Sequence, residues 1–345
     1  MRYKATMMNF YETQKISQVE WWKNYSSQPD WEREPEKWGR QNKVSYAHIT
    51  KGDWTKLLWK GIQVELPKYL STTIKAHSGV GNLLSSWVVA ANLYFPARIN
   101  THLKDLLLGF LQTRISSDII EVVDVELEYS LEGNLSPKVL LGEMNGGRGT
   151  GQTSPDVAFI VKTKQGIGLI LTECKYTEHS FYRCSARRAT DRGDKPANPH
   201  PEKCLQAAAT CNYEALPCHQ KVWGRKYIDY FELTAIGKSK LTRCPAATAG
   251  YQLFRQQSLA NGIKKSGKYD LVVSSVSFDA RNKALIRCLK TSGIPDFQNG
   301  WEEIYVHGAD FITWHHQDWV KFVRDNQHNE EFKNWLKYLN ERYGY

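Results

Sequence analysis

The sequence predicts an α/β domain in which a central β-sheet is flanked by helices. Residues 157–161 and 167–171 are apolar runs on either side of a polar turn, which is the pattern of a buried β-hairpin. Residues 119–131 alternate between apolar and polar side chains, as a strand with one buried face does. Apolar residues recur at helical spacing over 83–95 and 103–111, which predicts two helices before the sheet.

These elements divide the chain into three parts. Residues 1–80 carry six tryptophans among charges and prolines, and we expect an extension of short helices and loops. Its aromatic side chains suit core packing, with stacking on unpaired bases as the alternative. Residues 81–310 hold the predicted core, including a basic, cysteine-containing insertion over 176–245. Residues 311–345 are expected to form C-terminal helices, because an amphipathic stripe runs over 332–339.

The composition is that of a globular protein. Of the 345 residues, 41% are hydrophobic, and no run approaches the ~18 apolar residues of a membrane span. The first residues lack the apolar core of a secretory signal, so we expect a cytoplasmic or nucleoid-associated protein that is neither secreted nor bound to a membrane. The seven cysteines are then expected to be reduced, since an odd number does not form a closed set of disulfides.

The net charge of +10 is concentrated in one region. Residues 176–268 contain 16 Lys and Arg but 7 Asp and Glu, which accounts for nearly the whole excess. A basic face of this kind suits a polyanion such as nucleic acid, and a solvated basic loop is the alternative.

The predicted hairpin ends in a cluster of charged residues. Asp156 lies at the start of its first strand, and Glu173 and Lys175 lie two residues apart at the end of the second. Alternate residues of a strand share a face, so Cys174 points into the core, and antiparallel pairing brings Asp156 beside Glu173. Paired carboxylates and the main-chain carbonyl of Cys174 suit Mg²⁺, and a neighbouring lysine can orient or deprotonate a water. The pattern therefore predicts hydrolysis of phosphodiester bonds.

These residues resemble the motif of the PD-(D/E)XK nuclease superfamily, which has the restriction-endonuclease-like fold. The matching positions are Pro155, Asp156, Glu173 and Lys175, with Cys174 as the variable residue. The resemblance implies an αβββαβ core with a mixed sheet. It also implies that Asp156 and Glu173 hold Mg²⁺ or Mn²⁺, and that Lys175 positions or activates the attacking water.

In this superfamily a helix before the sheet often supplies another acidic residue. The predicted helix over 83–95 offers only Asn92, so Glu126 or Glu128 of the first strand is the candidate. The alternative for both glutamates is a solvent-facing row of charges.

The elements after the hairpin match the order that the resemblance implies. A helix is expected over 245–261, followed by a strand over 269–278, and residues 304–307 are expected to add an edge strand. In the superfamily this helix often aims polar groups at the scissile phosphate. Gln252 and Arg255 fit that role, and ordinary surface positions are the alternative.

Several arginines are candidate nucleic-acid contacts. Arg148 lies in the glycine-rich loop 146–151, whose backbone could approach a phosphate, unless this loop is only a mobile connector. The predicted contacts are Arg148, Arg183, Arg187, Arg188, Arg192 and Arg255.

The cysteines of the insertion allow a second metal site. A structural zinc would be held by Cys184, Cys211, Cys218 and His219. A helix is expected over 202–216, and on it Cys204 and Cys211 lie about 10.5 Å apart, too far to share one ion. Plain buried thiols are therefore the alternative, and an iron–sulfur cluster has less support because no C-x₂-C is present.

Together these patterns predict a Mg²⁺-dependent endonuclease that cuts DNA, with double-stranded DNA as the expected partner and a homodimer as one arrangement. A role in restriction or defence follows by analogy. The alternatives are a repair or transposon-end nuclease, and a catalytically inactive nucleic-acid-binding protein on the same fold.

Overall fold

The computed structural model describes most of the chain. The described residues are 9–25, 54–73, 79–149, 151–191, 193, 195–206, 218–306, 308–328 and 330–345. Two residues named above, Arg192 and Cys211, lie outside these ranges.

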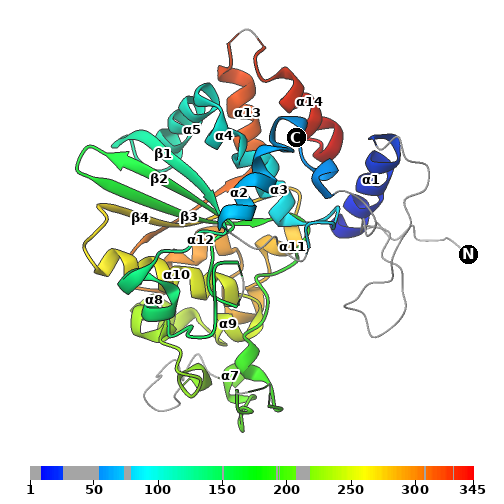
Figure 1. Ribbon diagram of the computed structural model, residues 1–345. Coiled ribbons are helices and arrows are strands. Elements are labelled where there is room, and N and C mark those ends of the chain that lie inside the picture. The colour runs from blue at the N-terminus through cyan, green and yellow to red at the C-terminus, as the bar shows by residue number, and fades with distance from the viewer. Residues whose placement is uncertain are drawn as a thin grey trace, which may run out of the picture.

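Five strands form one mixed sheet in the order β1-β2-β3-β4-β5 (Figure 1). They are β1 (Ile119–Leu127), β2 (Val157–Thr163), β3 (Ile167–Lys175), β4 (Leu271–Phe278) and β5 (Asp310–His315). The first three strands pair antiparallel, whereas β4 and β5 run parallel to β3. The predicted fold class, a mixed sheet flanked by helices, is confirmed.

Helices precede, interrupt and follow the strands. The α-helices are α1 (Phe10–Tyr25), α2 (Glu65–Thr73), α3 (Ser86–Tyr94), α4 (Pro96–Ile99), α5 (Thr101–Arg114), α6 (Pro137–Leu140), α7 (Lys203–Gln206), α8 (Ala235–Lys240), α9 (Pro245–Thr248), α10 (Tyr251–Lys265), α11 (Lys283–Ile286), α12 (Phe297–Gly300), α13 (His316–Asn326) and α14 (Lys333–Tyr343). Short 3₁₀ turns are η1 (Trp54–Leu57), η2 (Lys60–Ile62), η3 (Gly133–Leu135), η4 (Ser185–Arg187), η5 (His219–Lys221), η6 (Tyr227–Tyr230), η7 (Lys290–Ser292) and η8 (Glu302–Ile304). None of the helices in the described ranges is long and apolar enough to cross a membrane.

The sheet separates two hydrophobic cores. On one face, side chains such as Val157, Ile170 and Cys174 pack with α3, α5, α13 and α14. On the other face, Leu169 and Leu171 pack with α10. Figure 1 shows α5 and α13 above the sheet and α10 below it. Since side chains alternate along a strand, the β3 residues that continue the series from Leu171 point toward α10.

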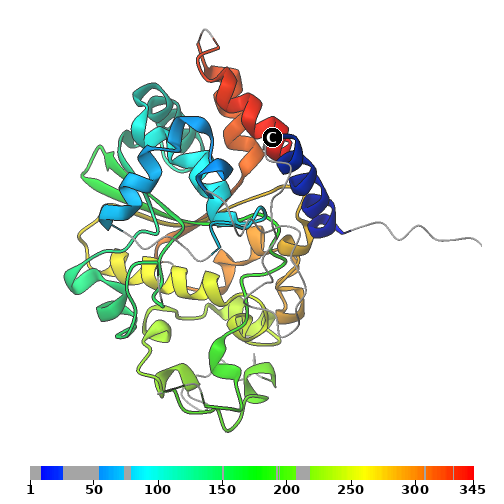
Figure 2. The ribbon, with the colours of Figure 1, turned by 45° about the vertical axis from the view of Figure 1, so that its right-hand side comes forward.

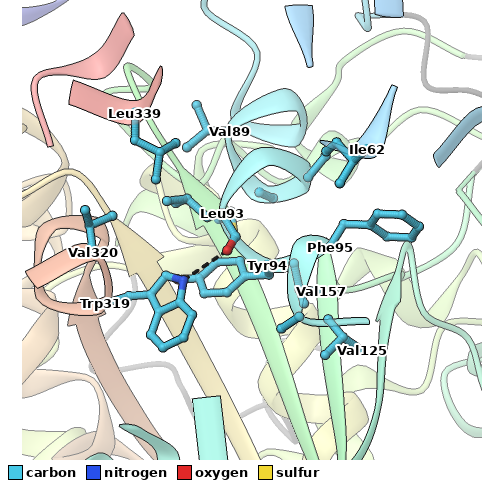
Figure 3. Packing of buried hydrophobic residues seen from close by; sticks show 14 of the residues in the cluster. Ile62, Val89, Leu93, Tyr94, Phe95, Val125, Val157, Trp319, Val320 and Leu339 are labelled. Atoms are coloured by element: carbon cyan, nitrogen blue, oxygen red, sulfur yellow. Dashed lines mark hydrogen bonds between the residues drawn. The ribbon is translucent and has the colours of Figure 1, made fainter. Parts of the chain in front are cut away.

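The first core is closely packed around Tyr94 and Trp319 (Figure 3). The indole N–H of Trp319 donates a hydrogen bond to the main-chain carbonyl of Leu93 at 3.0 Å, which joins α13 to α3. The predicted helices begin at capping residues. Ser85 accepts from the backbone of α3, and Asn100 accepts from the backbone of α5.

The ends of the described chain meet on the same side of the molecule. Figure 2 shows α1 lying along α14. Gln18 donates to the main-chain carbonyl of Arg342 at 2.6 Å and accepts from its guanidinium, which is buried. The N-terminal extension is thus anchored by the C-terminal helix.

Three expectations differ from the observed elements. The segment 311–345, expected to be helical, begins within strand β5 and continues into α13 and α14. The last edge strand is β5 (Asp310–His315), whereas residues 302–304 form a 3₁₀ turn and Tyr305 makes only an isolated bridge to Leu233. The helix predicted over 245–261 is two helices, because the N–H of Gly250 folds back onto the carbonyl of Pro245 and ends α9. The helix predicted over 202–216 falls largely outside the described residues, which include only α7 there.

The basic insertion leaves and rejoins the core at one place. The N–H of Phe181 donates to Ala249, the N–H of Cys184 donates to Ala246, and the N–H of Tyr251 donates to Tyr182. These contacts hold the two ends of the insertion side by side next to the start of α10.

Candidate active site

Three carboxylates come from neighbouring positions on three adjacent strands. Val157 pairs with both Leu127 and Thr172, so Glu128, Asp156 and Glu173 occupy the next row at the end of β1, β2 and β3. The backbone N–H of Glu128 donates to the Asp156 carbonyl at 3.0 Å. Residues opposite one another on antiparallel strands share a face, which brings these carboxylates to the α10 side of the sheet.

Asp156 and Lys175 are each fixed by a hydrogen bond. The Asp156 carboxylate accepts from the backbone N–H of Cys174 at 2.7 Å, across the β2–β3 pair. The Lys175 ammonium donates to the Glu173 carboxylate at 2.6 Å, and these two side chains are 3% and 8% exposed. Asp156 is the more accessible carboxylate of the two that the motif names.

The pKa values of this cluster reflect burial first and the neighbouring carboxylates second. Burial, followed by the charges of Glu173 and Glu128, raises the pKa of Asp156 well above its usual value. Burial and Glu173 raise the pKa of Glu128 to about 8. Burial alone would lower the pKa of Lys175, but Glu173, Glu178 and Asp156 raise it, so the amine is protonated at neutral pH. Lys175 is a single positive charge beside Asp156, Glu173 and Glu128. A bound cation would lower the pKa values of Asp156 and Glu128.

Glu128, one of the two candidates from the first strand for a further acidic residue, lies beside this cluster. It is 7% exposed, its backbone has a left-handed φ of +48° directly after β1, and its charge raises the pKa of Asp156. Glu126, the other candidate, is bound to Arg148 at 2.6 Å. The alternation of side chains in β1 places both glutamates on the same face of the predicted strand. The register with β2 distinguishes them, because Glu126 pairs with Ala158 whereas Glu128 lies opposite Asp156.

A cavity of about 370 Å³ opens over the cluster. Asp156, Glu173 and Lys175 line it together with Gln252 from the start of α10. Its other walls come from Tyr11 of α1, from residues between 79 and 87, and from the loop 177–182. The segments that build the cavity are far apart in the sequence, so the site depends on the complete fold.

The oxygen donors match a hard divalent cation. Among the described residues, no group of three or more His, Cys, Asp or Glu side chains could hold a metal ion by itself. Mg²⁺ needs fewer protein ligands, because it takes one or two carboxylates and keeps waters or substrate phosphates as the others. Asp156, Glu173 and the Cys174 carbonyl supply ligands of that kind.

Comparison with known proteins assigns the family. A family model described as restriction endonuclease associating with ARP matches residues 21–344. The chain belongs to this family. No curated protein and no solved structure matches it. Membership in a restriction-endonuclease family indicates a nuclease.

Gln252 lies at the charged cluster of this member of the restriction-endonuclease family. It lines the cavity, and its side-chain oxygen is buried without a hydrogen-bond partner among the described residues. A buried acceptor without a partner is costly, so a water or another hydrogen-bond donor is the expected partner of this oxygen.

Two of the predicted nucleic-acid contacts are engaged inside the protein. Arg148 donates to Glu126, to Tyr69 and to main-chain carbonyls of β1 and its end. Arg255 binds Glu143, which is fully buried, at 3.0 Å. These guanidinium groups anchor the glycine-rich loop and α10, which argues for a structural role rather than phosphate binding.

The other arginines lie on the basic insertion. Arg183 and Arg188 are exposed, while Arg187 is half-buried and donates to the carbonyl of Ala247 at 2.7 Å. Arg192 lies outside the described residues.

The predicted zinc ligands have other contacts where they are described. Cys184 accepts from the Gln220 amide at 3.0 Å, and the His219 ring contacts the Pro196 carbonyl at 3.1 Å. Cys218 precedes η5, and Cys211 lies outside the described ranges. Within those ranges the thiols form no metal-binding group.

Proposed function

We propose that this protein is a metal-dependent deoxyribonuclease of the PD-(D/E)XK type that hydrolyses phosphodiester bonds with Mg²⁺ or Mn²⁺. The observation that carries the proposal is the meeting of Asp156, Glu173 and Lys175 at one end of the sheet, on the floor of a cavity. Its family makes a role in restriction or defence the favoured one.

Asp156, Glu173 and the main-chain carbonyl of Cys174 would hold the ion, and a bound cation would favour the ionised form of Glu128 beside them. When bound, a divalent cation polarises a phosphoryl oxygen and lowers the pKa of a water. All these donors are oxygens, which is the ligand type that Mg²⁺ and Mn²⁺ prefer.

Lys175 orients the nucleophile. Because its pKa is raised, the amine is an ammonium that donates hydrogen bonds and does not accept a proton in this state. It can hold an attacking water in line with the scissile bond and can neutralise charge that develops on the phosphate. In-line attack gives inversion at phosphorus.

Gln252 and the insertion would bind the substrate. The Gln252 amide can donate to a non-bridging phosphate oxygen, since this side chain lines the cavity. The exposed Arg183 and Arg188 suit contacts with flanking phosphates.

The test is cleavage of DNA, as plasmid and as oligonucleotides, by wild-type protein with Mg²⁺ and with EDTA, and by Asp156→Asn and Lys175→Ala. We expect cleavage only by the wild type with metal, and a loss of about 10²–10⁴-fold in each variant. Lys164→Ala is the matched control, because Lys164 lies at the exposed turn of the same hairpin, where it pairs with Asp118 at 2.7 Å. Cleavage that persists in both site variants would point to a contaminant and refute the proposal.

A further inference from the structure

An exposed histidine lines the cavity over the charged cluster. His179 belongs to the loop that follows β3, and two neighbours in this loop, Thr177 and Ser180, are 6% and 9% exposed. In the part of the chain that the structure describes, no hydrogen bond or ion pair engages the His179 ring. The imidazole is therefore available to a molecule that enters the cavity.

The backbone that carries His179 is held on both sides. Asn282, which is 1% exposed, donates to the main-chain carbonyl of Tyr176 at 2.9 Å and to that of Glu178 at 2.8 Å. On the other side, the N–H of Phe181 donates at 2.8 Å to the main chain between α9 and α10. These bonds fix the position of the histidine relative to the end of β3, while its ring stays free.

The other charged groups of the cavity already have partners. The Lys175 ammonium donates to the Glu173 carboxylate at 2.6 Å, and the Asp156 carboxylate accepts from a backbone N–H across the β2–β3 pair at 2.7 Å. Under the proposed function these two carboxylates also bind the ion. Glu178 accepts from a backbone N–H of its own loop at 2.8 Å.

Histidine is the side chain in this cavity that is best suited to move a proton at neutral pH. An imidazole ordinarily changes its charge between about pH 5 and 8, whereas a tyrosine ordinarily ionises near pH 10. The charged and titratable side chains that line the cavity with His179 are Tyr11, Asp156, Glu173, Lys175, Glu178 and Tyr182.

We propose that His179 is the general base of this site and accepts a proton from the attacking water. This inference rests on the proposed nuclease function and adds a catalytic residue outside the motif. Hydrolysis needs a proton acceptor, and Lys175 acts there as a hydrogen-bond donor.

The proposed step is balanced in atoms and protons. The water oxygen forms a bond to phosphorus, and its proton passes to the neutral imidazole of His179. The bond between phosphorus and the leaving sugar oxygen breaks, and that oxygen takes a proton from solvent. Because His179 is exposed, the imidazolium can then release its proton to solvent before the next turnover.

The test is the pH dependence of duplex cleavage at saturating Mg²⁺ by the wild type, His179→Ala and His102→Ala. His102 of α5 is the matched control, because its side chain is 73% exposed and does not line the cavity. We expect His179→Ala to lower kcat about 10²–10⁴-fold with KM within about twofold, and His102→Ala to match the wild type.

Two further readouts are specific to a base. Wild-type kcat should fall as the pH is lowered from about 8 to about 5, because only the neutral imidazole accepts a proton, and His179→Ala should lose this dependence. Added imidazole should restore activity to His179→Ala but not to Lys175→Ala. A pH profile of His179→Ala that matches the wild type, or no restoration by imidazole, overturns the proposal.

Binding and leaving-group measurements exclude other roles for His179. Equal affinity of wild type and His179→Ala for a labelled duplex in EDTA, measured by fluorescence anisotropy, supports the proposal. A loss of affinity as large as the loss of rate would make His179 a phosphate contact and overturn it. A substrate with sulfur in place of the leaving oxygen needs no proton there, so full recovery of His179→Ala on it would make His179 an acid. If the wild type cuts with no divalent ion, the nuclease function itself fails, whereas every other contrary result refutes only the role of His179.

Discussion

Glu128 is a buried carboxylate whose protonation depends on the charges around it. With a pKa raised to about 8 by burial and by Glu173, its carboxyl is largely neutral at pH 7 in the metal-free protein. Glutamine has a neutral side chain of the same shape, so at this position it resembles the protonated Glu128 of the metal-free protein.

We predict that Glu128→Gln changes the free energy of unfolding by less than about 1 kcal/mol, because little charge is lost. The same change should reduce metal affinity or cleavage about 10- to 100-fold, as removal of a supporting group beside a metal does. Calorimetry and cleavage with a Mg²⁺ titration measure the two effects. In Glu126→Gln, which loses only the Arg148 pair, cleavage should persist while stability falls by about 1 kcal/mol. Unchanged cleavage in Glu128→Gln would remove this residue from the site.

The relative position of the charged residues in the hairpin could be predicted from the sequence. Whether an arginine contacts nucleic acid or forms an internal ion pair could not. Asp156 and Glu173 are 17 residues apart on paired strands, so a two-residue period and one turn determine their relation. The partner of Arg255 is Glu143, 112 residues away, and no local pattern reports such a contact. Exposed and anchored arginines look alike in a sequence because both are charged and long.

At the level of elements, α10 is attached to the loop that follows α6 through a buried ion pair. Glu143 accepts from Arg255, from Thr153 at 2.8 Å and from Tyr227 at 2.7 Å. The pair therefore fixes both the helix that carries Gln252 and the segment that leads into β2.

We predict that Arg255→Met lowers the free energy of unfolding by about 3–5 kcal/mol, since it leaves a buried carboxylate without its cation. Denaturant unfolding measures this effect. The double variant Arg255→Met with Glu143→Gln should recover much of the loss, because the uncompensated charge is gone. If Arg255→Met instead keeps full stability and weakens nucleic-acid binding, the residue acts as a phosphate contact.

The parallel half of the sheet was harder to predict than the antiparallel half. β2 and β3 are joined by a tight turn, whereas β3 and β4 are separated by the basic insertion and α10. Strand β5 reads D-F-I-T-W-H, in which Ile312 and Thr313 are half-buried, so its burial does not alternate as in an ordinary edge strand. Its aromatic and β-branched residues were the only feature of the sequence that indicated a strand.

Over the whole molecule, stability should depend on pH through His316. Burial lowers the pKa of this histidine from 6.5 to about 4, and Tyr345, Asp279, His315 and Arg281 surround it. Between these pH values the unfolded chain binds a proton that the folded chain does not. Stability is then complete above pH 6.5 and falls as the pH approaches 4.

We predict a loss of about 3 kcal/mol in the free energy of unfolding over this interval from His316 alone. Denaturant titrations from pH 7 to pH 4 measure it, and His316→Asn should flatten that part of the profile. His102→Asn is the control, because His102 is an exposed histidine. An equally steep profile in His316→Asn would show that other groups cause the decline.

The uneven charge of the chain should appear in the salt dependence of nucleic-acid binding. Arg183→Ala and Arg188→Ala should each reduce the slope of log affinity against log salt by about 0.7–0.9, if each contacts one phosphate. Lys333→Ala, at an exposed ion pair on α14, should leave the slope unchanged. Equal slopes in all three variants would place the binding surface elsewhere.

The hydrogen bonds from Phe181 to Ala249 and from Cys184 to Ala246 hold the two ends of the insertion next to each other. Because its two ends are held together there, we expect the length of the segment between them to vary without a change in the register of β1, β2 and β3. Under the proposed function, such variation would alter which substrates bind while the strand ends that carry Asp156 and Glu173 keep their geometry.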